Sequence, residues 1–209
     1  RFLTITCILS IFFADFLCVS MLQLSANAKQ KYEEGVLEEY GDFQIGVSTE
    51  DGSYFTSEEI KKIKALDQIT GYTDGFYREL EEDQDIYALG VKDDAINRSR
   101  YKYSFPVKGS KVVINEYLAR KYQVGQGDTF QIGKKTFEVG EILRNDSYTD
   151  QRRCMVIMER DALHKFLGDG KGQCNYVLLQ CPDEETSGLS SRLEKMSGNF
   201  SVVTVKENE

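Results

Sequence analysis

The sequence predicts an α+β domain that follows an N-terminal membrane-spanning helix. Residues 1–25 are mostly apolar, residues 26–41 are polar and favour a helical stalk, and residues 42–209 contain short strand and helix patterns. These patterns are intermixed without a regular βαβα rhythm, which favours the α+β class. Hydrophobic residues make up 41% of the 209 residues, the proportion of a packed chain. The roughly 180 residues after the apolar start suffice for one domain or for two small lobes.

The apolar segment has the length of a transmembrane helix. Residues 2–24 read FLTITCILSIFFADFLCVSMLQL, and about 20 such residues cross the hydrocarbon core. Each Leu, Ile, Phe or Val favours insertion by about 0.3–0.6 kcal/mol, whereas Asp15 opposes it by about 3 kcal/mol. The sum favours insertion, with Asp15 facing another helix or a polar cavity. A role of Asp15 in helix packing or coupling and simple tolerance of its charge both remain open.

A cleaved signal peptide is the alternative interpretation of this segment. Ala26, Asn27 and Ala28 match the A-x-A pattern of a cleavage site. The apolar stretch is longer than the roughly 7–15 residues of a signal-peptide core, which favours the anchor. Arg1 on the inner flank agrees with the positive-inside rule. Both interpretations place residues 42–209 outside the cytoplasm.

The first half of the domain is predicted to hold strands and one helix. Strands are expected over residues 43–47, 75–80 and 85–91. Thr56 and Glu59 have the spacing of a capping box, so a helix is expected to begin there and to end near Gly71. Its apolar face would contain Ile60, Ile63, Leu66 and Ile69. A polar loop is expected to follow the third strand up to Pro106.

The second half is predicted to continue with short elements. A buried strand over 112–114 leads to Asn115, which would cap a brief helix. A turn over 125–128 precedes a hairpin of 129–132 and 136–143. Further strands are expected over 155–158, 176–180 and 200–205, and helices over 161–167 and around Leu189, Leu193 and Met196.

Composition excludes several classes of function. The net charge of −8 argues against nucleic-acid binding and against a domain that lies flat on anionic lipid. His164 is the single histidine, so zinc sites with two or three histidines are excluded. Any Ser-His-Asp or Cys-His arrangement would have to use His164.

Three cysteines lie in the domain, at Cys154, Cys174 and Cys181. Their odd number and the absence of a CxxC pattern argue against a disulfide framework and a zinc knuckle. A single bridge between Cys154 and Cys174 and three buried free thiols both remain open, and the free thiols are favoured.

No catalytic, cofactor-binding or metal-binding residue is assigned. The glycine-rich loop 168–172 lacks the spacing of a phosphate-binding loop and is interpreted as a mobile turn. Cys154 or Cys174 with His164 lacks any protease signature, and His164 is expected on the polar side of its helix. The acidic pairs and triplets Asp93, Asp94 and Asp183 to Glu185 lack an EF-hand pattern. Most aromatic residues are expected in the core, with an exposed contact patch as the alternative for Tyr101, Tyr103 and Phe105.

Residues 112–143 carry a resemblance to a known family. They read VVINEYLARKYQVGQGDTFQIGKKTFEVGEIL. The strand "VVIN", the helix with "E-x-LA", the "GD" turn and the following hairpin resemble the MacB-like periplasmic core domain of FtsX-like ABC-transporter permeases. The motif is structural and covers about 30 residues, although the layout fits nearly the whole chain. Residues Val139 to Ile142 depart by one position from the family's "V-x-G-I", so the end of the hairpin is expected to differ.

The resemblance implies a fold and a function. It implies an extracellular domain of a bacterial membrane permease that pairs as a dimer and is driven by a separate cytoplasmic ABC ATPase. The domain would move a substrate or regulate an extracytoplasmic partner such as a cell-wall hydrolase, and it would have no catalytic residues or cofactor. Two alternatives are a single-pass anchored binding or sensor domain without an ATPase partner and an anchored thiol hydrolase.

Overall fold

The computed structural model describes residues 19–28, 30–31, 35, 37, 39–80, 86–144, 151–170 and 172–205. The chain divides into two compact units, Arg1–Glu39 and Tyr40–Glu209. Most of the predicted span 1–25, Asp15 included, lies outside the described residues. Where the chain is described, no helix is long and apolar enough to cross a membrane. Residues 19–28 are helical and expose Val19, Met21, Leu22 and Leu24.

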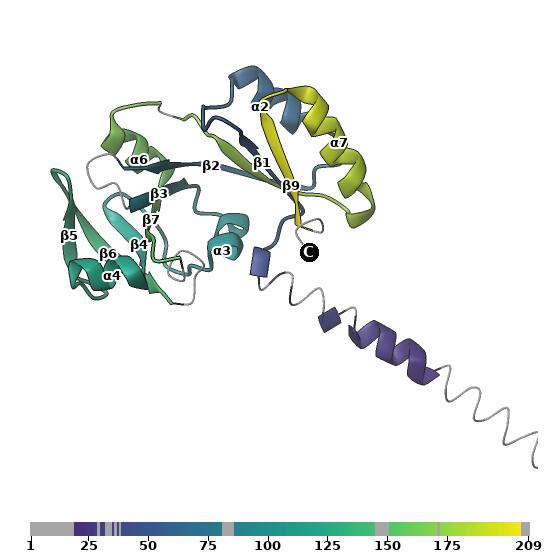
Figure 1. Ribbon diagram of the computed structural model, residues 1–209, viewed down its shortest axis with the longest axis horizontal. Coiled ribbons are helices and arrows are strands. Elements are labelled where there is room, and N and C mark those ends of the chain that lie inside the picture. The colour runs from purple at the N-terminus through teal and green to yellow at the C-terminus, as the bar shows by residue number, and fades with distance from the viewer. Residues whose placement is uncertain are drawn as a thin grey trace, which may run out of the picture. The chain divides into compact units, whose positions relative to one another are not determined.

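The second unit contains one mixed sheet of nine strands in the order β5-β6-β4-β7-β3-β2-β8-β1-β9 (Figure 1). The strands are β1 Ile45–Thr49, β2 Gly71–Glu79, β3 Ile86–Val91, β4 Lys111–Asn115, β5 Thr129–Ile132, β6 Lys135–Leu143, β7 Cys154–Glu159, β8 Tyr176–Gln180 and β9 Phe200–Thr204. The helices are α2 Ser57–Lys64, α3 Ala95–Tyr101, α4 Glu116–Tyr122, α6 Arg160–Leu167, η2 Asp183–Glu185 and α7 Thr186–Met196. The predicted α+β class is confirmed.

One half of the sheet is a βαββαβ unit. Strands β2, β8, β1 and β9 are neighbours and pair antiparallel, and α2 and α7 join them in the chain order β1-α2-β2 and β8-α7-β9. This is the order of a ferredoxin-like unit. Both helices lie on the same face of these strands (Figure 1), where Ile45, Val177 and Leu193 pack together in the core.

The other half is inserted between β2 and β8. Strands β3 to β7 extend the same sheet, and α4 and α6 cover one face of it. Residues of the 103–107 segment pack on the opposite face with Val113 and Ile157. The two lobes considered from the sequence are therefore two halves of a single sheet, joined where β2 pairs with β3.

Helix α2 begins as predicted but is shorter. Thr56 and Glu59 form the reciprocal capping box, and the helix ends at Lys64 rather than near Gly71. Leu66 and Ile69 still pack against the same core from the connection to β2. Their apolar periodicity reflects burial and not helical backbone, which explains the overestimate.

Helix α3 occupies part of the predicted polar loop. Asp94 caps it by accepting a hydrogen bond from the Asn97 amide at 3.0 Å. Ile96 is the only buried apolar residue of α3, so the sequence has no amphipathic pattern that would predict this helix. Tyr103, which follows it, is 3% exposed. The alternative of an exposed patch that includes Tyr103 is therefore wrong.

The pairing of β4 with β6, near the end of the hairpin, contains a β-bulge. Strand β4 pairs parallel with β6, and the register moves from Val112–Val139 to Val113–Glu141, so Gly140 is skipped. The Gly140 carbonyl accepts a hydrogen bond from Gln126 Nε2 at 2.8 Å. A Cβ at Gly140 would lie 2.3 Å from the Phe105 ring. The absence of a side chain at Gly140 thus lets Phe105 lie directly on the strand.

Strand glycines differ in how much space surrounds them. A Cβ at Gly75 in β2 would lie 2.6 Å from the Gly90 carbonyl oxygen and 2.3 Å from the Tyr176 hydroxyl. Gly75→Ala is expected to cost about 2 kcal/mol, since backbone and a buried ring must both move. At Gly46 the nearest atom would be 3.7 Å away, so Gly46→Ala is expected to be nearly neutral. Urea unfolding of both variants tests this, and equal losses would contradict it.

Candidate functional site

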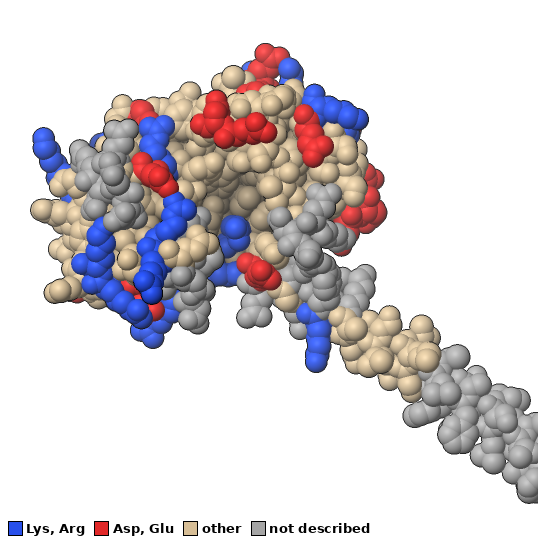
Figure 2. All heavy atoms as spheres, in the orientation of Figure 1, with Lys and Arg blue, Asp and Glu red and all other residues tan. Residues whose placement is uncertain are grey.

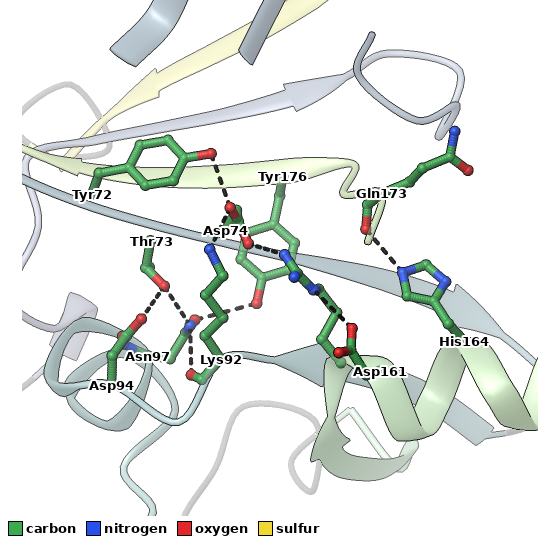
Figure 3. A network of polar contacts seen from close by, with 11 residues as sticks. Tyr72, Thr73, Asp74, Lys92, Asp94, Asn97, Asp161, His164, Gln173 and Tyr176 are labelled. Carbon is green, nitrogen blue, oxygen red and sulfur yellow. Dashed lines mark hydrogen bonds and ion pairs between the residues drawn. The ribbon is translucent and has the colours of Figure 1, made fainter. Parts of the chain in front are cut away.

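A buried ion-pair network lies where the two halves of the sheet meet (Figure 3). The Asp74 carboxylate is 6% exposed and accepts from Lys92 Nζ at 2.7 Å. The Tyr72 hydroxyl donates to the same oxygen at 3.1 Å. Arg160 forms an ion pair with the other oxygen. One carboxylate thus holds two cations and a phenol.

Strand register brings these charges together. Strand β3 pairs parallel with β7, with Val91 opposite Glu159. Lys92 and Arg160 directly follow these two residues, so both leave the sheet at the same end. Strand β2 pairs with the other edge of β3, with Gly75 opposite Val91, which places Asp74 beside Lys92. No local sequence motif encodes this arrangement, and sequence reasoning missed it.

A second set of polar contacts lies beside the first on β2 (Figure 3). Asn97 is fully buried and donates from Nδ2 to Thr73 Oγ1 at 2.8 Å and to the Lys92 carbonyl at 3.0 Å. Its Oδ1 accepts from the Tyr176 hydroxyl at 3.3 Å. The Thr73 hydroxyl in turn donates to Asp94, the cap of α3. These bonds fix α3 on the sheet.

The ion-pair network is suited to holding elements together. Both Asp74 oxygens are already occupied, and the partners come from β2, the end of β3 and the start of α6. A buried charge pair that is well hydrogen-bonded holds its elements in one arrangement. The network therefore joins the two halves of the sheet, with both Asp74 oxygens engaged.

His164 is buried, contrary to the expectation that it lies on the polar side of α6. It is 1% exposed and stacks on Phe76 with ring centroids 4.0 Å apart. Its Nε2 lies 2.9 Å from the Gln173 carbonyl oxygen, which can only accept, so this nitrogen carries the proton. Its Nδ1 lies 3.4 Å from Asp169 Oδ1. Both ring nitrogens thus have oxygen partners.

The start of the glycine-rich loop is anchored by Asp169. Gly168 ends α6 with a φ of 74°, and Asp169 then accepts from Arg78 at 2.7 Å and from the Tyr54 hydroxyl at 3.0 Å. Burial, with the neighbouring Asp169 carboxylate, raises the pKa of Tyr54 to about 12. Lys171 lies outside the described residues, so mobility of the remaining loop stays a prediction.

Cys154, Cys174 and Cys181 are buried thiols that form no disulfide among the described residues, so the alternative of a Cys154–Cys174 bridge is wrong. Burial raises the pKa of Cys174 to about 12, and the negative charge of Asp74 adds to the effect. Cys174 is therefore a protonated thiol at neutral pH, the opposite of an activated nucleophile. This chemistry gives no support to a thiol hydrolase.

Cys174 is expected to resist alkylation in the folded chain even at pH 10, where an ordinary thiol is largely thiolate. Iodoacetamide labelling followed by peptide mass spectrometry, with and without urea, measures this. Folding raises the pKa of the Cys174 thiol from 9.0 to about 12. The contribution of the protonated thiol to the free energy of unfolding is therefore complete below pH 9 and is lost as pH rises toward 12. Equal labelling of Cys174 in both states would contradict the burial.

The acidic groups considered for calcium have other roles. Asp93 pairs with Arg98 at 2.7 Å, and Asp94 caps α3. Residues Asp183–Glu185 form η2. Among the described residues no group of three or more His, Cys, Asp or Glu side chains is placed to hold a metal ion.

A pocket of about 280 Å³ lies on the face of the βαββαβ half opposite α2 and α7. We call it the aromatic pocket, and its rings are Tyr40, Phe43, Tyr77, Tyr87, Tyr101 and Tyr176. Gly46, Leu178 and Val203 add the strand surface, and Arg100 of α3 lies at its border. Figure 2 shows the surface hollowed between α3 and strands β1 and β9. The sequence patterns gave no sign of this pocket, because its residues come from six separate segments.

The comparisons give the fold a name. No family model and no curated protein matches the sequence. Among solved structures, the periplasmic region of MacB from Actinobacillus actinomycetemcomitans is similar at a TM-score of 0.56 and 10% identity, over 81% of this chain and 92% of that one. The extracellular domain of the noncanonic ABC-type transporter YknZ from Gram-positive bacteria gives 0.51 and 15%, over 78% and 99%. The α+β domain of this chain has the fold of the MacB periplasmic region.

Proposed function

We propose that this chain is the extracytoplasmic part of an ABC-transporter permease in a bacterial cell membrane. The observation that carries the proposal is the fold, which matches 92% of the MacB periplasmic region and 99% of the YknZ domain. Under this proposal residues 1–25 are the first transmembrane helix, 26–41 are a helical stalk and 42–209 are the outer domain. The long apolar segment in the sequence supports this division.

The proposed mechanism is mechanical. A separate cytoplasmic ATPase would drive a dimer of permease subunits, and the outer domain would transmit that motion to an exported substrate or to an extracytoplasmic partner. The joint at Asp74 supports this role, because it ties β2, β3 and α6 together and lets the two halves move as one body. The domain itself would perform no catalysis.

The test is to purify the epitope-tagged natural protein from the membranes of its source and identify the proteins that accompany it. An ATP-binding subunit and ATP hydrolysis in proteoliposomes are the expected result. Removal of the outer domain is expected to uncouple hydrolysis from transport. A protein with no associated ATPase and no further apolar span of about 20 residues would overturn the proposal.

A single-pass anchored binding domain is the second candidate. The aromatic pocket favours it, because a concave site lined by rings needs no ATPase to bind a ligand. Under this alternative the same purification yields the chain without an ATP-binding subunit.

A further inference from the structure

The aromatic pocket owes its shape to the alternation of strands β1 and β8. Ile45, Val47 and Leu179 point to the core under α2 and α7. Residues between them point the other way, and Gly46 lies opposite both Leu178 and Val203 in the sheet. Because Gly46 has no side chain, the centre of this face is hollow. A Cβ there would make ordinary van der Waals contact, at 3.7 Å from the Phe43 ring and 3.8 Å from Leu178, so a larger side chain would take up space in the pocket.

The walls of the pocket contain tyrosine rings that pack against one another. Tyr77 lies between Tyr87 and Tyr176, at centroid distances of 5.5 Å and 6.4 Å, and both pairs are inclined by 23°. Tyr101 meets Tyr176 edge to face. Stacked and edge-to-face rings at such distances attract one another, and a planar ring in the pocket extends the same packing.

The charge in the pocket is positive and comes from Arg100. Of the described residues that line it, Arg100 alone is charged, in a chain whose net charge is −8. Its guanidinium lies 5.8 Å from the Phe43 ring and 5.9 Å from the Tyr101 ring, and it donates to the Tyr40 carbonyl at 3.5 Å. Where the chain is described, the Arg100 guanidinium makes this one hydrogen bond, so most of its N–H donors are available to a ligand. A planar guanidinium beside aromatic rings is a good partner for a carboxylate.

Volume limits the occupant. At about 280 Å³ the pocket lies just below the usual range of roughly 300–1,000 Å³ for small-molecule sites. It fits one fused ring system with a short side chain.

We propose that the aromatic pocket binds a small aromatic carboxylate, with the ring on the tyrosine row above Gly46 and the carboxylate on Arg100. The Tyr176 hydroxyl stays neutral at physiological pH, since burial raises its pKa well above the ordinary value. The floor of the pocket therefore does not repel an anion. This binding is independent of whether the chain belongs to a transporter.

The experiment uses the full chain in an uncharged detergent with indole-3-propionate as the probe. The protein contains no Trp, so indole fluorescence reports the ligand alone. Indole-3-propionamide is the matched neutral ligand, and empty micelles give the background of partition. Saturable binding of the acid, about tenfold tighter than binding of the amide, is expected from one charge-assisted contact.

Three variants separate the contributions. Gly46→Val fills the hollow and is expected to weaken both ligands by about tenfold or more. Arg100→Gln is expected to abolish the preference for the acid while binding of the amide is retained. Arg192→Gln removes a charge from α7, where Arg192 contacts Gln68, and is expected to change nothing.

Circular dichroism melting verifies that each variant is folded. Equal affinity for acid and amide in the wild type, or full binding by Arg100→Gln, would overturn the role of Arg100. Saturable binding that survives Gly46→Val in a folded chain would place the ligand elsewhere and overturn the proposal. An absence of saturable binding of indole-3-propionate by the folded wild type would do so as well.

Discussion

Replacing Asn115 with alanine is expected to lower the free energy of unfolding by about 3 kcal/mol. Asn115 is fully buried and its Oδ1 accepts from two amides, Leu118 at 3.1 Å and Met155 at 3.0 Å. Its Nδ2 donates to the Arg153 carbonyl at 2.8 Å. Alanine removes the cap of α4 and leaves the Met155 amide without this acceptor in the core. Urea unfolding of the full chain measures the loss.

The matched control is Thr56→Ala, which removes the cap of α2. Among the described residues, the Thr56 side chain bonds only to Glu59, within the capping box and on the surface. Its loss is expected to cost about 1 kcal/mol, the usual value for a cap. Equal losses for the two variants would mean that the bonds of Asn115 to β7 contribute nothing, which would contradict the argument.

Asn115 also shows what the sequence could and could not predict. Its position after a short apolar strand and before "EYLA" correctly predicted a helix cap. That cap depends on neighbours within four residues. The bonds to Arg153 and Met155 depend on β4 pairing with β7, which is some 40 residues away in the chain. Local pattern contains no information on that pairing.

The same distinction explains the errors in the elements. The hairpin β5–β6 and its tip were predicted nearly to the residue, because turn chemistry is local. Helix α2 was overextended, because apolar residues beyond Lys64 are buried without being helical. Helix α3 was missed, because its stability comes from the buried amide of Asn97 rather than from an apolar face.

The candidate site was the least predictable part. The aromatic pocket combines residues from Tyr40 to Val205, and the charged partners of Asp74 come from the end of β3 and the start of α6. In the sequence Lys92 and Arg160 are ordinary surface cations. They face Asp74 only because β3 and β7 run parallel and end together.

Asp74→Asn is expected to destabilise the domain by about 3 kcal/mol, the lower end of the range for breaking a buried ion pair. The lower end applies because Lys92 remains 41% exposed and can turn to water. Arg160 is 17% exposed and would keep only the Asp161 carboxylate, 3.8 Å from its Nε. Denaturant unfolding monitored by circular dichroism measures the change. Glu79→Gln is the control on the same strand, since Glu79 and Arg153 form an exposed pair. It is expected to have little effect.

The double variant Asp74→Asn with Arg160→Met separates the charge from the packing. Methionine keeps an apolar side chain of similar length and removes the cation that has lost Asp74, so the double variant is expected to recover about 1–2 kcal/mol relative to Asp74→Asn alone. Recovery would show that the loss of stability in Asp74→Asn arises from the buried Arg160 charge, as expected if Asp74 and Arg160 stabilise one another. Strictly additive losses would instead mean that Asp74 and Arg160 act independently, and the two halves of the sheet would then be held by strand pairing alone.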